Sequence, residues 1–235
     1  MSPCIVRQWD YSNPSIYSGF LILRTVDRDV RQPVDFALRK VPRQARSQAT
    51  FDAVVEACAR LLGEMGYQAV TTNHVAERAG VAIASLYEYF PNKDAIVAQV
   101  AERLMSRVMS ELGLAVPTVL DQAPQQAVGY WLQLIYDVLA QEQALLRVFY
   151  YEVPFTNQLP VVRELGPKLL QFSHSMRHRA GNTVEIKYHD ASLYLIVNLV
   201  SNTLIQMILD PPEHIAREEI LLALTVRLES WISGH

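Results

Sequence analysis

The side chains best suited to bind a charged partner lie between residues 71 and 93. Tyr87 precedes Pro91, and Lys93 follows Asn92, at which a new helix is predicted to begin. A phenol hydroxyl, an ammonium group and the free N–H groups of a helix start are groups with which proteins hold phosphates. The arrangement therefore indicates an anion-binding surface, for which a nucleic acid is one partner.

Two short helices, about 73–79 and 82–89, are predicted to carry these residues. Gly80 between them can adopt the left-handed conformation that ends the first helix, and Ala76 is small where the helices would cross. Apolar contacts between the helices would come from Val75, Val81, Leu86 and Phe90. These are the requirements of a helix-turn-helix. A helical corner that binds no DNA would use the same core residues, so spacing leaves both interpretations open.

The run Gly80-Val81, then Leu86-Tyr87-x-Tyr89-Phe90-x-Asn92-Lys93, resembles the DNA-binding domain of the tetracycline-repressor (TetR) family of bacterial regulators. The resemblance covers about residues 46–110 by motif and the remainder only by helical layout. It implies an all-α fold, in which an N-terminal three-helix helix-turn-helix domain is joined to a larger helical domain for ligand binding and dimerisation.

The resemblance implies that Thr72, Asn73, Tyr87 and Lys93 meet DNA. On the second helix, the side chains that could face bases are Ile83, Ala84, Ser85, Glu88 and Tyr89, and Arg46 ends a basic arm that could bind the DNA backbone. Thr72 is equally suited to cap the first helix, so both roles stay open. The family often has Ser where this chain has Ala82 and Gly where it has Ala84; the missing Ser removes a capping bond worth about 1 kcal/mol. Small apolar side chains here favour reading of thymine methyl groups or of DNA shape.

Charge is distributed unevenly along the 235 residues, whose net charge is −3. Residues 1–46 carry eight Lys/Arg against four Asp/Glu, whereas residues 104–235 carry nine against thirteen. A basic arm ahead of the helix-turn-helix and an acidic remainder favour a modular regulator over a uniform enzyme.

The resemblance implies three parts: an extension over 1–45, a DNA-binding domain over 46–92 and a ligand-binding and dimerisation domain over 93–235. The extension has no clear period and is expected to be poorly ordered, with a basic end: Arg39, Lys40, Arg43 and Arg46. That end could follow the DNA backbone or minor groove. A solvated tail without function is the alternative.

The first firm helix is predicted from Ser47, as its N-cap, to Met65, with Cys58 on its apolar face. Cys58 is interpreted as a small buried hydrophobe, with a redox sensor as the alternative. A second long helix is predicted over 93–112, ended by Gly113 and Pro117. Further helices are expected near 121–141, 142–152, 161–180, 189–209 and 212–232, the last starting at Asp210-Pro211-Pro212-Glu213.

The helix over 189–209 is apolar almost all round, so it must be covered on every side. The family resemblance implies a homodimer formed there, through the helices near 189–209 and 212–232. No uninterrupted apolar run approaches the ~18 residues that span a membrane, so a cytoplasmic protein is expected.

Several residues of the second domain could line a ligand cavity: Trp131, Tyr136, Phe149, Tyr150, Met176, Tyr194 and Asn198. Each could instead be an ordinary core residue. His174 and His178 have the spacing of a metal chelate, which His189 could join, but Arg177 and Arg179 beside them favour a solvated helix end. We therefore expect neither a metal nor another cofactor, and the sequence carries no known catalytic constellation.

The resemblance implies a homodimeric repressor, released from a palindromic DNA operator by a small, largely apolar effector. The alternatives are a DNA-binding protein that needs no ligand and an all-helical enzyme in which residues 71–93 form only a helical corner.

Overall fold

The computed structural model describes residues 34–122, 124–179 and 189–233, in which every regular element is a helix. The all-α fold is as predicted. The elements are α1 (Ala45–Ala69), α2 (Thr72–Ala79), α3 (Ile83–Tyr89), α4 (Lys93–Leu120), α5 (Pro124–Gln141), α6 (Gln143–Tyr151), a 3₁₀ turn η2 (Thr156–Gln158), α7 (Pro160–Arg179), α8 (His189–Leu209) and α9 (Arg217–Ser233).

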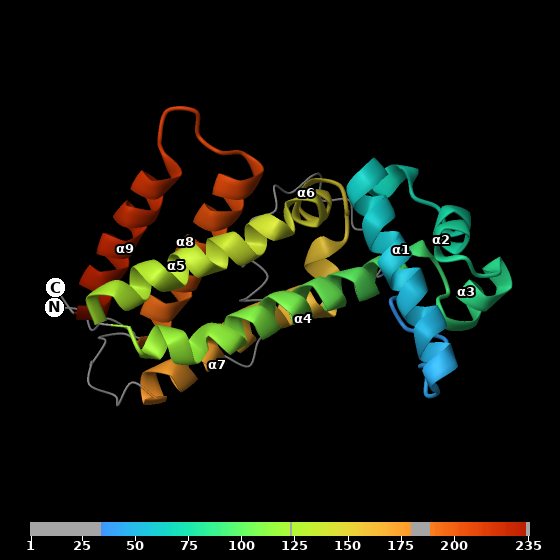
Figure 1. Cartoon of the computed structure of the whole chain (residues 1–235), viewed down its shortest axis with the longest axis horizontal. Helices are drawn as coiled ribbons and strands as arrows, with labels where there is room; N and C mark the ends of the chain where they lie inside the picture. The colour runs from blue at the N-terminus through green and yellow to red at the C-terminus, as the bar shows by residue number, and fades with distance from the viewer. Residues whose placement is uncertain (1–33, 123, 180–188, 234–235) are drawn as a thin grey trace, which may run out of the picture.

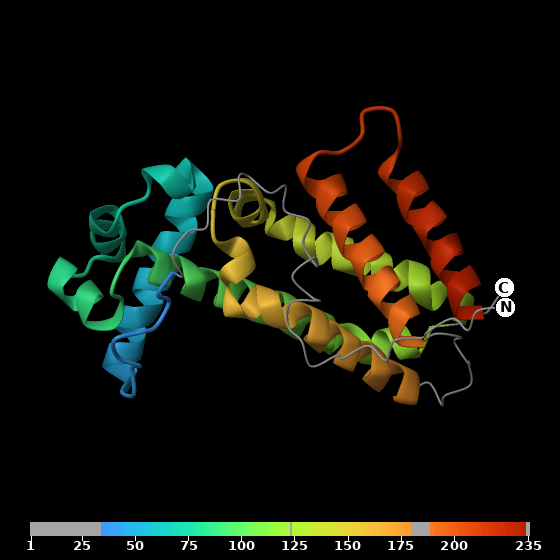
Figure 2. The ribbon, with the colours of Figure 1, turned by 180° about the vertical axis from the view of Figure 1, so that it is seen from behind.

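Helices α1, α2 and α3 form one end of the molecule, and α4 runs from them along the larger domain (Figure 1). α4 packs against α5 and α7, and α5 packs in turn against α8 and α9. The view from behind shows α8 crossing α5, with α9 beside it and the lower end of α8 near α7 (Figure 2). α6 contacts α1, so the larger domain meets the DNA-binding end through α6 as well as through α4.

Helix α1 begins earlier and ends later than predicted. Gln44 is its N-cap, and the expected cap Ser47 instead lies in the first turn, where its Oγ accepts the Gln44 N–H at 3.1 Å. Near the other end, Gly66 has φ +77° and ψ 168°, a region that side-chain-bearing residues avoid. The regular helix is therefore interrupted at Gly66, directly after the predicted end at Met65, and one more turn follows the kink.

Two helix limits of the larger domain differ from the prediction. α4 continues to Leu120 with Pro117 inside it, because Val116 and Val119 are buried there and their burial offsets the ~3 kcal/mol cost of an internal proline. α9 starts at Arg217 rather than near 212, so Pro211 and Pro212 belong to the preceding loop.

Two clusters of buried side chains form the core. The larger runs without a break from α1, α2 and α3 through α4 to α5, α6 and the start of α7; it includes Phe51, Phe90, Ile96 and Phe155. The smaller joins α5, α8 and α9 around Leu132 and Leu204. The larger cluster therefore crosses the expected domain boundary at residue 92.

Helix α8 departs from the expectation about membrane spans. Its segment Ala191–Leu209 is long and apolar enough to cross a membrane by length and composition, because its polar residues carry no charge. Within the molecule α8 packs against α5, α6, α7 and α9, yet only 39% of the segment is buried.

Within the described part of the expected extension, the segment 34–38 packs against the folded chain. Val34, Phe36 and Leu38 are partly buried against the larger cluster. These three apolar side chains alternate with exposed residues and so share one face of the segment.

Candidate DNA-binding surface

The turn between α2 and α3 is built as predicted. Gly80 has φ +67° and ψ 31°, the left-handed conformation, and the next N–H, of Val81, donates to the Ala76 carbonyl at 3.0 Å. Val75 and Leu86 are fully buried between the helices and α1. This packing fixes the angle at which α3 leaves the turn.

The outer face of α3 carries most of the residues expected to face bases. Ile83, Ala84 and Glu88 are exposed, and Ser85 is partly buried. Tyr89, which was also expected to face DNA, is buried: only 5% of it is exposed, and its ring packs edge-on against Phe51 at 6.0 Å. Tyr89 is a core residue because it lies three residues after Leu86, on the inner face of the helix.

The start of α2 and the end of α3 are joined by two expected DNA-binding residues. The hydroxyls of Thr72 and Tyr87 lie 3.0 Å apart and share a hydrogen bond. Thr71, not Thr72, caps α2, accepting the His74 N–H at 3.2 Å. Thr72 is therefore released from capping, and with the exposed Asn73 it lies beside the outer face of α3.

Lys93 does not extend freely into solvent. Its Nζ donates to the Tyr67 carbonyl at 2.9 Å and lies 3.9 Å from the centroid of the Tyr67 ring. The Tyr67 hydroxyl donates to Asp94 at 2.7 Å. An ammonium has three donors, so this arrangement leaves Lys93 able to donate to a phosphate while it also ties α4 to the end of α1.

Charges around the helix-turn-helix are partly neutralised by ion pairs. Arg78 and Glu64 form a two-pronged pair at 2.8 and 2.9 Å, and the hydrogen bond from Arg78 lowers the pKa of Glu64. Glu88, the one charged residue of α3, lies 4.0 Å from Lys40. Arg46 is exposed in the first turn of α1, where a phosphate could approach it.

The residues expected to bind a ligand lie on α5, α6, α7 and α8. Phe149 is buried in the larger cluster, Trp131 packs against the same cluster, and Tyr136 packs against the smaller one. The side chain of Met176 lies outside the described part of the structure.

The polar members of that set have partners inside the protein. The Tyr150 hydroxyl accepts the Gln206 side-chain N–H at 2.7 Å, and the Asn198 amide donates to the Tyr194 carbonyl at 2.8 Å, one turn back on α8. The side chains of His174, His178 and His189 lie outside the described part, and the described residues contain no cluster of metal-ligating side chains.

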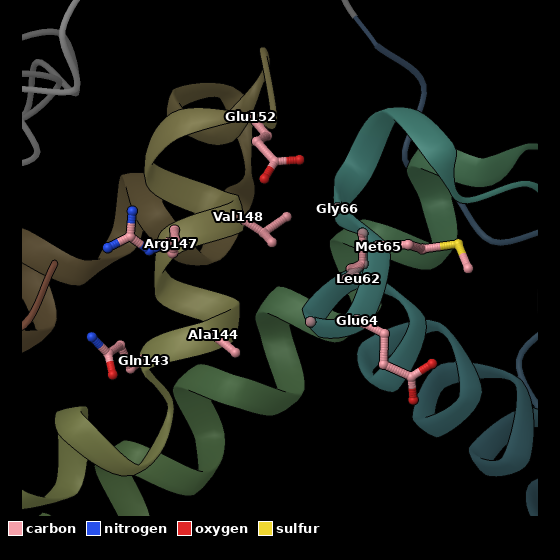
Figure 3. A pocket seen from close by; sticks show the side chains of 10 residues that line it. Leu62, Glu64, Met65, Gly66, Gln143, Ala144, Arg147, Val148 and Glu152 are labelled. Atoms are coloured by element: carbon pink, nitrogen blue, oxygen red, sulfur yellow. The ribbon is translucent and has the colours of Figure 1, made fainter.

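A cavity of about 590 Å³ lies between α1 and α6 (Figure 3). It is lined by Leu62, Gly63, Glu64, Met65, Gly66, Gln143, Ala144, Arg147, Val148 and Glu152, and none of these was expected to bind a ligand. Gln143 and Arg147 donate to the last carbonyls of α8, at 2.7 and 2.6 Å. Because α1 belongs to the DNA-binding end and α6 to the larger domain, the cavity is an open groove at the junction of the two domains.

Comparison with known proteins shows similarity at two levels, the DNA-binding domain and the fold. Helices α2 and α3 with the turn at Gly80 form a helix-turn-helix whose second helix has an exposed outer face. Residues 54–100 match the model of the bacterial regulatory proteins of the tetR family. The DNA-binding domain of the chain is thus similar to that of the TetR family of bacterial regulators, and the chain as a whole shares the TetR fold.

Two curated relatives and one solved structure illustrate the similarity. An uncharacterized HTH-type transcriptional regulator of Mycobacterium tuberculosis is 39% identical over 77 residues, which is 33% of this chain and 36% of the relative. The HTH-type transcriptional repressor KstR of Rhodococcus jostii is 39% identical over 57 residues, covering 24% and 27%. A TetR-family regulator of Mesorhizobium loti shares the fold, with a TM-score of 0.60 and 12% identity over 81% of this chain and 98% of that one.

Proposed function

We propose that the chain is a homodimeric, cytoplasmic transcriptional repressor that binds a palindromic DNA operator and is released by a small, largely apolar effector. The observation that carries this proposal is the two-sided α3: Leu86 and Tyr89 are buried, while Ile83, Ala84 and Glu88 face solvent beside the Thr72–Tyr87 pair. The KstR relative is named a repressor, which favours repression over activation.

Exposed apolar side chains on α8 and α9 support the dimer. Leu195 and Leu199 lie one turn apart on α8, and Leu222 and Val226 do so on α9; all four are exposed. Large apolar side chains exposed on neighbouring helices are typical of an interface. A two-fold pair of subunits would place two copies of α3 in successive major grooves, about 34–36 Å apart.

The effector site is proposed among Trp131, Tyr136, Phe149, Tyr150, Met176, Tyr194 and Asn198. Apolar and aromatic side chains with a few polar groups are typical of small-molecule sites. Because Asn198 and Tyr150 already have partners within the protein, an effector would exchange these hydrogen bonds or use their remaining capacity.

Selection of bound fragments from random DNA by the purified full-length chain tests the proposal. We expect enrichment of a palindromic sequence, and weaker binding by Tyr87→Phe to all sequences alike, since phosphate contacts position without specifying. Binding that no small molecule changes would favour the ligand-independent alternative. Failure to bind any DNA at low salt would refute the proposed regulatory function. It would favour the alternative of an all-helical enzyme in which residues 71–93 form only a helical corner.

A further inference from the structure

Residues 34–40, which we call the strap, lie between the two domains. Within the strap, Val34, Phe36 and Leu38 are partly buried against the larger cluster, whereas Asp35 and Ala37 are exposed. Alternation of this kind places one face of an extended segment against the core. The strap is thus held by its side chains although it belongs to no helix.

The strap is hydrogen-bonded to the end of α3. The Arg39 N–H donates to the Tyr89 carbonyl at 2.9 Å, and the Arg39 guanidinium donates to the Tyr87 carbonyl at 3.1 Å. The last carbonyls of a helix have no partner within the helix, and a positive charge there is favourable. Arg39 therefore caps α3, and its guanidinium is engaged by protein rather than directed only to DNA.

Asn92 adds a second connection to the strap. Its Oδ1 accepts the Ala95 N–H at 2.7 Å and so caps α4, and its Nδ2 donates to the Asp35 carbonyl at 3.3 Å. The position of the strap is consequently coupled to the start of α4 as well as to the end of α3.

On its other side the strap meets the turn that follows α6. The ring of Phe36 lies 5.3 Å from that of Phe155, which lies 5.8 Å from that of Tyr67. Phe155 is buried, and the buried Thr156 hydroxyl, 2.7 Å from the Phe149 carbonyl, holds this turn against α6. The α6 turn is thereby packed between the strap and the end of α1.

We propose that Phe36 is a positioning residue: through the strap it fixes the recognition helix α3 relative to the α6 turn of the larger domain, without touching DNA. The inference rests on the proposed function, because α3 must be the element that reads DNA. The strap thus has a role within the protein. The exposed cations that can still meet DNA are Arg43, just before α1, and Arg46, in its first turn.

The test compares Phe36→Ala with Val41→Ala in the full-length chain. Val41 is the matched control because it follows the strap directly and is exposed. Circular dichroism first establishes that both variants keep the helical content of the wild type. Should Phe36→Ala lose it, Phe36→Leu, which keeps an apolar side chain but removes the ring contact, takes its place.

Two quantities are then measured, the Kd for the fragment selected from random DNA and amide hydrogen exchange in the DNA-free protein. We expect Phe36→Ala to raise Kd at least about tenfold, equivalent to ~1.4 kcal/mol, with the same dependence on salt as the wild type. We also expect the amides of Arg39 and Phe90 to exchange faster, while those of α9 exchange as in the wild type. Val41→Ala should change neither quantity.

Three results would overturn the inference. One is an unchanged Kd and unchanged exchange at Arg39 and Phe90. Another is a salt dependence flattened by about one unit of slope, since that is the loss of a phosphate contact. The third comes from a double-mutant cycle: strictly additive effects of Phe36→Ala and Phe155→Ala would show that Phe36 does not act through the α6 turn.

Failure of the proposed function gives a different pattern. If the wild-type chain binds no DNA at low salt, the proposed function is refuted, and the exchange measurement alone decides the inference. Faster exchange at Arg39 and Phe90 in Phe36→Ala then still supports the strap as the support of α3, and unchanged exchange overturns it.

Discussion

At the scale of single residues, Lys93 combines an expected DNA contact with a contact inside the protein. Its Nζ is bonded to the Tyr67 carbonyl and lies over the Tyr67 ring. Tyr67 is 26 residues away in the chain, so no local spacing indicates the pair. The contact of Lys93 with Tyr67 therefore could not be predicted from the sequence, whereas its expected contact with DNA came from the family resemblance.

Lys93→Ala should lower the free energy of unfolding by about 2 kcal/mol, because it removes a charged hydrogen bond and a cation–π contact. Lys40→Ala is the matched control: Lys40 lies 5.8 Å from the Tyr89 ring centroid and is exposed, so we expect a change within about 0.5 kcal/mol. Urea unfolding measures both. Equal values for the two variants would show that the Tyr67 contact contributes little.

Cys58 should be chemically inert in the folded chain. It is fully buried, and burial raises the pKa of its thiol to about 12, although the positive charge of Lys93 opposes this shift. The thiolate is the reactive form, so at about pH 8 almost none is present. In a Cys4→Ser variant, we expect iodoacetamide to label Cys58 only after unfolding in guanidinium chloride. Rapid labelling of the native protein would restore the redox-sensor interpretation.

At the scale of elements, two glycines with positive φ have different surroundings. Around Gly80 there is open space, so an added Cβ would meet nothing. At Gly66 an added Cβ would collide with the Glu152 carboxylate, whose Oε2 also accepts the Tyr67 N–H at 2.8 Å. Gly66 therefore permits the close approach of α1 and the end of α6.

Gly66→Ala should lower the free energy of unfolding by about 3 kcal/mol, since its backbone region is nearly restricted to glycine and the displaced Glu152 carboxylate would lose its hydrogen bond with the Tyr67 N–H. Gly80→Ala should cost only about 1–2 kcal/mol, the penalty of the left-handed conformation. Thermal unfolding of both variants gives the comparison. A smaller loss for Gly66→Ala than for Gly80→Ala would contradict the described approach of Glu152.

Elements set by local chemistry could be predicted from the sequence, and those set by distant contacts could not. Gly80 ends α2 through its own conformational freedom, and α3 starts one residue from the predicted place. Pro117 indicated a helix end, but burial of Val116 and Val119 extends α4 beyond it. The strap was missed because its alternation at Val34, Phe36 and Leu38 is too short to stand out without Phe155 as its partner.

At the scale of the whole molecule, the exposed apolar surface of α8 and α9 determines the expected assembly. Leu195 is 56% exposed and Leu222 is 65% exposed, so neither supports the fold of a single subunit strongly. Their exposure is costly only when nothing covers them.

Leu195→Glu and Leu222→Glu should each convert the proposed dimer to a monomer that keeps its helical content, because a charge would be buried in the interface. Leu114→Glu on α4, at a residue that is 79% exposed, is the control and should leave the dimer intact. Sedimentation equilibrium measures the association. A dimer constant unchanged by both substitutions would place the interface elsewhere.

The uninterrupted larger cluster has a consequence for cooperativity. Phe51 of α1, Ile96 of α4 and Phe155 beyond α6 belong to one set of packed side chains. Domains that share a single core usually unfold in one cooperative transition. Calorimetry should therefore find no separate melting of α1–α3, and an excised fragment over residues 46–92 should remain unfolded, because it lacks the apolar partners that α4 and the α6 turn provide.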